Sequence, residues 1–106
     1  MYKVLILPLA KIDVKKAADW YNSRQEGLGK RFILHVRQKI NLLRKGPFNY
    51  VTRYDDVKTA VLDIFPFMIH YTVNNTEKLI IISAILHTSR NPDAWKSKHE
   101  SPDIID

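Results

Sequence analysis

A histidine and an arginine follow an apolar run near the end of the chain, in the stretch "AILHTSRNPDAW" at residues 84–95. His87 can transfer protons near neutral pH, because the reference pKa of imidazole is about 6.5. Arg90 can clamp an anionic group through two parallel hydrogen bonds. Two interpretations are open: the pair is a polar strand end before a turn, or a rigid strand presents it to a partner.

Positive charge is the second chemical feature of the sequence. The 106 residues carry a formal net charge of +6, which suggests an acidic partner. Residues 1–53 hold 12 of the 17 Lys and Arg but only 3 of the 11 Asp and Glu. Between Gly27 and Tyr54 there is no acidic residue, and five basic residues share one side of a helix expected at 30–45: Lys30, Arg31, Arg37, Arg44 and Lys45. This side is either a solvated surface or a binding surface for an acidic partner.

Several classes of site and location are disfavoured by composition. The sequence has no cysteine, and its four histidines lack the spacing of metal ligands, so neither a metal nor a cofactor is expected. The apolar run at the N-terminus is too short to span a membrane and lacks a secretory layout. We therefore expect a cytoplasmic location and no membrane partner.

The elements that must position these residues follow from apolar periodicity. Residues 2–8 read as a strand ended by Pro8. Asp13 is expected to cap a helix over 13–26, whose apolar stripe is Val14, Ala17, Ala18 and Tyr21. Gly27 and Gly29 then predict a tight connection to the second helix, which buries Phe32, Ile33, Val36, Ile40 and Leu43.

After Pro47 the apolar period changes to two, which predicts strands within 50–54, 55–63, 66–73 and 78–86. The last of these lacks alternation, so we expect it to be central. The order β-α-α-β-β-β-β predicts an α+β domain over 1–98, with a helical hairpin on one face of a small antiparallel sheet. Residues 99–106 are expected to form a loose tail. Two helices cover one face only, so the other face is expected to expose apolar surface to a partner.

Three stretches resemble a known family: "ADWYNSRQEGLGKRF", "FPFMIHYTV" and "AILHTSRNPDAW". In this order they are similar to the RelE/ParE superfamily of toxins from type II toxin–antitoxin systems, and the final His-x-x-Arg-x-Pro-x-x-Trp looks most like the ParE branch. The resemblance implies a plasmid-stabilisation-like toxin that inhibits growth and is neutralised by a cognate antitoxin. It also implies that the antitoxin packs against the helical hairpin and the sheet.

The two branches differ in target and chemistry. RelE-type relatives cleave messenger RNA in the ribosome without a metal, whereas ParE-type relatives inhibit DNA gyrase with no established chemical step of their own. RNA cleavage needs a proton-transfer group and several cations around one phosphate. If this chain is RelE-like, His87, Arg90 and Lys58 are the expected catalytic residues, with Arg53 the next candidate.

One departure from the pattern of the RNA-cleaving relatives favours the ParE-like alternative. RNA-cleaving relatives place a basic residue in the fourth strand, where this chain has Phe67-Met68-Ile69. The residues expected to bind antitoxin or target are Trp20, Arg31, Arg37, Arg44 and Trp95. A second alternative is a non-catalytic nucleic-acid-binding module, although the sequence lacks interleaved aromatics and glycines typical of one.

Overall fold

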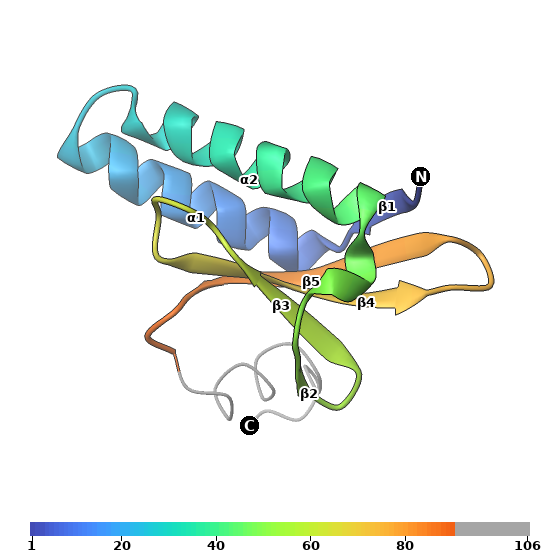
Figure 1. The fold of residues 1–106 in the computed structure, drawn as a ribbon. Helices are drawn as coiled ribbons and strands as arrows, with labels where there is room; N and C mark the ends of the chain where they lie inside the picture. The colour runs from blue at the N-terminus through green and yellow to red at the C-terminus, as the bar shows by residue number, and fades with distance from the viewer. Residues whose placement is uncertain (91–106) are drawn as a thin grey trace.

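The computed structural model describes residues 1–90 of the chain (Figure 1). Its elements are β1 (Lys3–Ile6), α1 (Pro8–Arg24), α2 (Leu28–Lys45), the 3-10 turn η1 (Pro47–Asn49), β2 (Thr52–Tyr54), β3 (Val57–Val61), β4 (Phe67–Asn74) and β5 (Leu79–His87). The predicted order β-α-α-β-β-β-β and the α+β class are confirmed. The expected tail at 99–106 and the candidate Trp95 lie outside the described residues.

The strands form one sheet in the order β1-β5-β4-β3-β2. From β2 to β5 the chain runs as an antiparallel meander, as predicted. β5 is central, between β1 and β4, which explains its unbroken apolar run. The sheet is not wholly antiparallel, however, because β1 pairs parallel with β5 from Lys3↔Leu79 to Ile6↔Ile82. The helical hairpin leads the chain away from β1. The meander then brings β5 beside β1, and the two strands run in the same direction.

The first helix begins earlier than the sequence predicted. α1 starts at Pro8, whose fixed φ suits the first helical position. The prediction that Asp13 caps the helix is therefore wrong. Asp13 lies in the second turn and is 5% exposed, and its Oδ2 accepts a hydrogen bond of 3.1 Å from the backbone N–H of Ile85.

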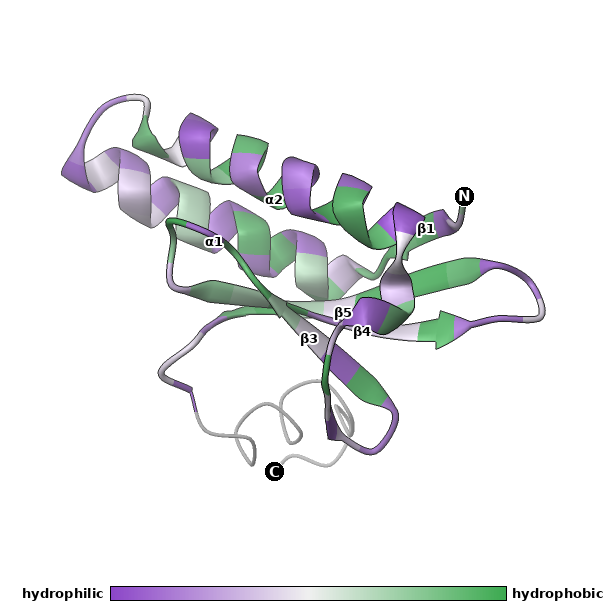
Figure 2. Cartoon of the chain, in the orientation of Figure 1, coloured by the Kyte–Doolittle hydropathy of each residue, from purple (hydrophilic) through white to green (hydrophobic). Residues whose placement is uncertain are grey.

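Both helices cover the same face of the sheet (Figure 1), and the core lies between these two layers. The predicted apolar arc of α2 is confirmed: Phe32, Val36 and Leu43 are buried, with Ile33 and Ile40 packed against them. Figure 2 shows the matching alternation of hydrophilic and hydrophobic bands along α2. The other face of the sheet carries a smaller buried cluster of Met68, Ala84 and Leu86.

Large exposed apolar side chains are fewer on the strands than on the helices, and the apolar surplus expected on the second face stays a prediction. Within the described residues, the large exposed apolar side chains of the strands are Leu5 and Val61. The helices carry more of them: Leu9, Ile12, Trp20, Leu34 and Leu42. Partner surfaces are therefore to be sought along the helices.

Tyr71 ties the sheet to the turn after α2. Its buried hydroxyl donates a hydrogen bond of 2.6 Å to the carbonyl oxygen of Pro47. Burial, with a smaller effect of the Tyr50 charge, raises the pKa of the Tyr71 phenol well above its ordinary value. A raised phenol pKa means that folding favours the neutral form. This contribution to stability is therefore complete below about pH 10 and is lost as the pH rises further.

Replacement of Tyr71 by phenylalanine should lower the free energy of unfolding at pH 7 by roughly 1–2 kcal/mol, because the buried Pro47 carbonyl loses its donor. The variant should also lose less stability between pH 9 and pH 11 than the unchanged chain. Urea unfolding at the three pH values measures both effects. Equal stability at pH 7, or an equal alkaline loss, would contradict the assigned role.

Candidate functional site

A one-residue irregularity in β5 decides which face of the sheet its polar end occupies. Tyr71 pairs with Ile82, but the preceding residue of β4, His70, pairs with Ala84, which leaves Ser83 as an extra residue. Ile82 and Ile85 consequently both pack in the core under the helices. Because side chains alternate along a strand, His87 also lies on the helix side.

His87 and Arg90 line one cavity of about 240 Å³ between β5 and α1. We call this cavity the cationic pocket. Its lining residues are Asp13, Lys16, Ala17, Phe67, Ile85, Leu86, His87 and Arg90. The structure thus brings together the two residues that the sequence had paired. It adds Lys16, which the sequence analysis missed, although its position one turn before the exposed Trp20 was the available signal.

The cationic pocket lies where β5 continues beyond its neighbour β1. β1 ends at Ile6, opposite Ile82, and the N–H of Leu7 donates to the Ile82 carbonyl at 2.9 Å. Beyond this point α1 supplies the hydrogen-bond partner of β5, because the Asp13 carboxylate accepts a hydrogen bond from the Ile85 N–H. A carboxylate from the helix therefore occupies the hydrogen-bonding edge that another strand would otherwise use.

The hydrogen bonding of His87 defines what its ring can do. Its Nδ1 accepts a hydrogen bond of 3.0 Å from the backbone N–H of Ser89, and its ring centre lies 5.3 Å from that of Phe67. Since Nδ1 is the acceptor, this geometry assigns the proton of the neutral imidazole to Nε2. The ring then has its N–H donor at Nε2. To act as a general base through Nε2, the ring would have to move its proton from Nε2 to Nδ1. Nδ1 could then no longer accept the hydrogen bond from the Ser89 N–H.

Lys58 and Arg53 are not brought to this pocket. Lys58 pairs with Tyr71, four residues along β4 from Phe67, the partner of His87. Four residues span about 13 Å of strand. The Lys58 Nζ instead donates to the Tyr50 carbonyl at 3.3 Å and the Thr52 hydroxyl at 3.2 Å.

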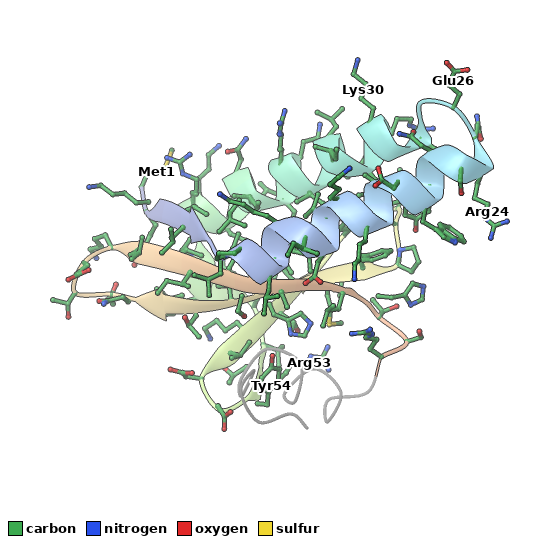
Figure 3. All side chains as sticks on the ribbon, turned by 180° about the vertical axis from the view of Figure 1, so that it is seen from behind. Met1, Arg24, Glu26, Lys30, Arg53 and Tyr54 are labelled. Carbon is green, nitrogen blue, oxygen red and sulfur yellow. The ribbon has the colours of Figure 1, made fainter. Side chains whose placement is uncertain are left out.

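Arg53 belongs to the opposite face of the sheet. Its Nε donates to the hydroxyl of Thr59 at 3.0 Å, and Figure 3 shows Arg53 and Tyr54 on the side of the sheet away from the helices. Tyr54 lies there beside the buried His70, with 3.2 Å between the hydroxyl and Nδ1. Met68 is buried on this face as well, and the β4 stretch Phe67-Met68-Ile69, where a basic residue is expected in an RNA-cleaving enzyme, has only apolar side chains.

A second cavity, of about 340 Å³, adjoins the cationic pocket. We call it the aromatic pocket, and it is lined by Ala17, Trp20, Tyr21, Pro66, Phe67 and His87. Trp20 is 52% exposed, its ring lies 4.6 Å from the Arg24 guanidinium carbon, and it contacts Tyr21 edge to face at 5.1 Å between ring centres. The two pockets share Ala17, Phe67 and His87, so they form one continuous depression.

The basic side of α2 forms a third feature, which we call the α2 groove. Lys30, Arg31 and Arg37 line a cavity of about 480 Å³ together with Gly27, Ile33 and Leu34. Arg44 is not part of it, because its Nε donates to the backbone carbonyl of Tyr2 at 3.0 Å and so holds β1 against α2. Figure 3 shows Arg24 and Lys30 near the end of the helical hairpin.

Metal-binding clusters and membrane-spanning helices are both absent from residues 1–90. This part of the chain holds no group of three or more histidine or carboxylate side chains placed to bind a metal ion. Its helices also include none that is long and apolar enough to cross a membrane.

Comparison with solved structures defines the class of fold. The chromosomal ParDE toxin–antitoxin system from P. aeruginosa matches with a TM-score of 0.73 at 18% identity, over 84% of this chain and 98% of that chain. The isolated E. coli RelE toxin matches with a TM-score of 0.63 at 13% identity, over 92% and 96%. The archaeal RelE–RelB complex from Pyrococcus horikoshii matches at 0.53 and 15% identity, over 85% and 98%. The fold is that of the RelE/ParE superfamily.

The sequence itself assigns the family. Residues 4–92 match the model of the ParE toxin of the type II toxin–antitoxin system parDE. The chain belongs to the ParE toxin family. Comparison with curated proteins by sequence finds no significant match.

Proposed function

We propose that this chain inhibits bacterial growth by binding DNA gyrase, without a chemical step of its own, and that a cognate antitoxin holds it inactive in the cytoplasm. Membership of the ParE family supports this function. The observation that carries it is the separation of the cationic candidates. His87 and Arg90 line one pocket, and Lys58 lies about 13 Å along the sheet from it. The β4 stretch Phe67-Met68-Ile69 adds no positive charge.

The α2 groove is the surface that we assign to the antitoxin. It combines three positive side chains, Lys30, Arg31 and Arg37, with the apolar Ile33 and the half-exposed Leu34. An acidic amphipathic segment matches this surface in both charge and apolarity. Of the predicted binding residues on α2, Arg31 and Arg37 line this groove, which supports the proposal, whereas the Arg44 Nε donates a hydrogen bond to the Tyr2 carbonyl.

Expression from an inducible promoter tests the proposed function. We expect growth to stop after induction, plasmid DNA from the arrested cells to lose negative supercoils, and co-expression of the antitoxin to restore both growth and supercoiling. The supercoiling readout separates gyrase inhibition from general toxicity. Normal growth with abundant folded protein, or arrest with unchanged supercoiling, would contradict the proposal.

A RelE-like ribonuclease is the second candidate, because His87, Arg90 and Lys16 do share one cavity. The two candidates differ in what replacement of His87 by alanine does. A proton-transfer role predicts a loss of roughly 10²- to 10⁴-fold in rate.

We expect instead that the His87→Ala variant keeps growth inhibition within about tenfold, since a binding role loses one donor worth roughly 1 kcal/mol. The concentration of inducer that halves the growth rate, corrected for protein level, measures this effect. A loss of a hundredfold or more would favour the ribonuclease.

A further inference from the structure

We propose that the continuous depression formed by the cationic and aromatic pockets binds a peptide segment of a partner protein in which a bulky apolar side chain stands next to acidic ones. This site lies between α1 and the end of β5 and differs from the α2 groove, since the two share no lining residue. It goes beyond the proposed function, which requires no second peptide site.

The aromatic pocket determines the apolar part of the ligand. Trp20, Tyr21 and Phe67 supply its rings, and Ala17 and Pro66 complete an almost wholly apolar lining. Trp20 stays 52% exposed although it is held in place by Arg24 and Tyr21. An exposed but fixed indole is a favourable anchor for binding, because little side-chain entropy remains to be lost when a ligand docks.

The cationic pocket determines the charged part of the ligand. Lys16 and Arg90 are exposed, and His87, which lines the same pocket, has its N–H donor at Nε2 in the assigned tautomer. Asp13 also lines this pocket, but its Oδ2 is already engaged by the Ile85 N–H. Two exposed positive charges therefore outnumber the single buried carboxylate of Asp13 in this lining, and an acidic side chain of the ligand complements the remaining positive charge.

Protein is favoured over nucleic acid by the lining of the aromatic pocket. A nucleobase has polar edges, and its recognition needs hydrogen-bond partners for those edges in addition to stacking. The lining of the aromatic pocket is predominantly apolar, so it suits an aliphatic or phenyl side chain better. A second copy of this chain is disfavoured by mutual repulsion, because each copy carries a net charge of +6.

Titration of the full chain with defined peptides tests this proposal. The chain is made by cell-free synthesis with ¹⁵N label, and the probe is an acetylated and amidated pentapeptide of the sequence Glu-Glu-Phe-Glu-Glu. We expect the indole N–H resonance of Trp20, assigned with a Trp20→Phe variant, to shift saturably. The peptides Lys-Lys-Phe-Lys-Lys and Glu-Glu-Ala-Glu-Glu should bind at least tenfold more weakly.

Two matched double variants locate the binding. Lys16→Glu with Arg90→Glu reverses two exposed charges in the cationic pocket and should weaken the binding of the acidic peptide at least tenfold. Lys30→Glu with Arg37→Glu reverses two exposed charges in the α2 groove and should change affinity less than threefold. Trp20→Ala alters the aromatic pocket alone and should also weaken peptide binding at least tenfold, measured by isothermal titration calorimetry because this variant lacks the Trp20 resonance.

Three results would overturn the proposal: no saturable shift at Trp20, a larger loss from the α2 pair than from the pocket pair, or a dimer in sedimentation that Trp20→Ala dissolves. The last would mean that a second copy fills the depression. Because the titration uses neither antitoxin nor gyrase, its outcome is independent of growth inhibition. If the toxin inhibits gyrase but does not bind the peptide, the proposed peptide site is rejected and the proposed function stands.

Discussion

Replacement of Gly29 by alanine is expected to lower the free energy of unfolding by about 3 kcal/mol, because the helical hairpin leaves no room for a Cβ atom. A Cβ built on Gly29 would overlap the backbone carbonyl oxygen of Ala18 and would press on the side chain of Asn22. Backbone atoms of a packed helix cannot move aside singly, so α1 and α2 must separate. That separation would also break the 2.8 Å hydrogen bond from the Gly29 N–H to Asn22 Oδ1.

The neighbouring Gly27 supplies the matched control. Its φ is +86°, in the region that L side chains rarely adopt, but open space surrounds its Cβ position. Gly27→Ala should therefore cost only about 1 kcal/mol, from backbone strain alone. Urea unfolding followed by circular dichroism compares the two variants. If Gly29→Ala lost no more than Gly27→Ala, close helix approach would not be what the glycine provides.

Asp13→Ala should lower the free energy of unfolding by roughly 2–3 kcal/mol, because it removes the acceptor of a buried backbone N–H. Asp13 accepts the hydrogen bond from the Ile85 N–H, and Ile85 lies on β5 beyond the last residue that pairs with β1. The same variant should broaden the resonances of His87 and Arg90, since Asp13 fixes the strand end from which both project.

Two further variants control for the loss of stability: one is a conservative change at the same position, and the other removes an exposed carboxylate. Asp13→Asn keeps an oxygen acceptor and should lose less than half as much stability. Asp19→Ala removes an exposed carboxylate whose partner is Lys15, at 3.1 Å, and should cost at most about 0.5 kcal/mol. Thermal or urea unfolding of the three variants measures the series. Equal losses for Asp13→Ala and Asp19→Ala would contradict the edge-capping role.

Periodicity predicted the elements well because each has one clear buried side. The 3.6-residue stripe of Phe32, Val36 and Leu43 and the glycines before it were enough to place α2. Asp13 was misassigned because an acidic residue before an apolar stripe is also the pattern of a helix cap. Its burial depends on β5, 72 residues further along, and local sequence carries no information about that contact.

The site was harder to predict because β5 gives no sign of its register. In "LIIISAILH" nearly every residue is apolar, so alternation cannot reveal that Ser83 is an extra residue. Without the irregularity, His87 would lie on the face of Met68 and His70. With it, His87 lies with Lys16 under α1. The grouping of His87 with Arg90 could be predicted from their spacing, but their separation from Lys58 could not.

Addition of the purified chain to DNA gyrase tests most directly whether the toxin acts by binding rather than by cleaving RNA. Relaxed plasmid, ATP and gyrase are incubated with increasing toxin, and the same preparation is added to ribosomes translating a defined messenger. We predict that supercoiling falls as toxin concentration rises while the messenger stays intact. Cleavage of the messenger at the A-site codon, with supercoiling unchanged, would contradict this mode of action.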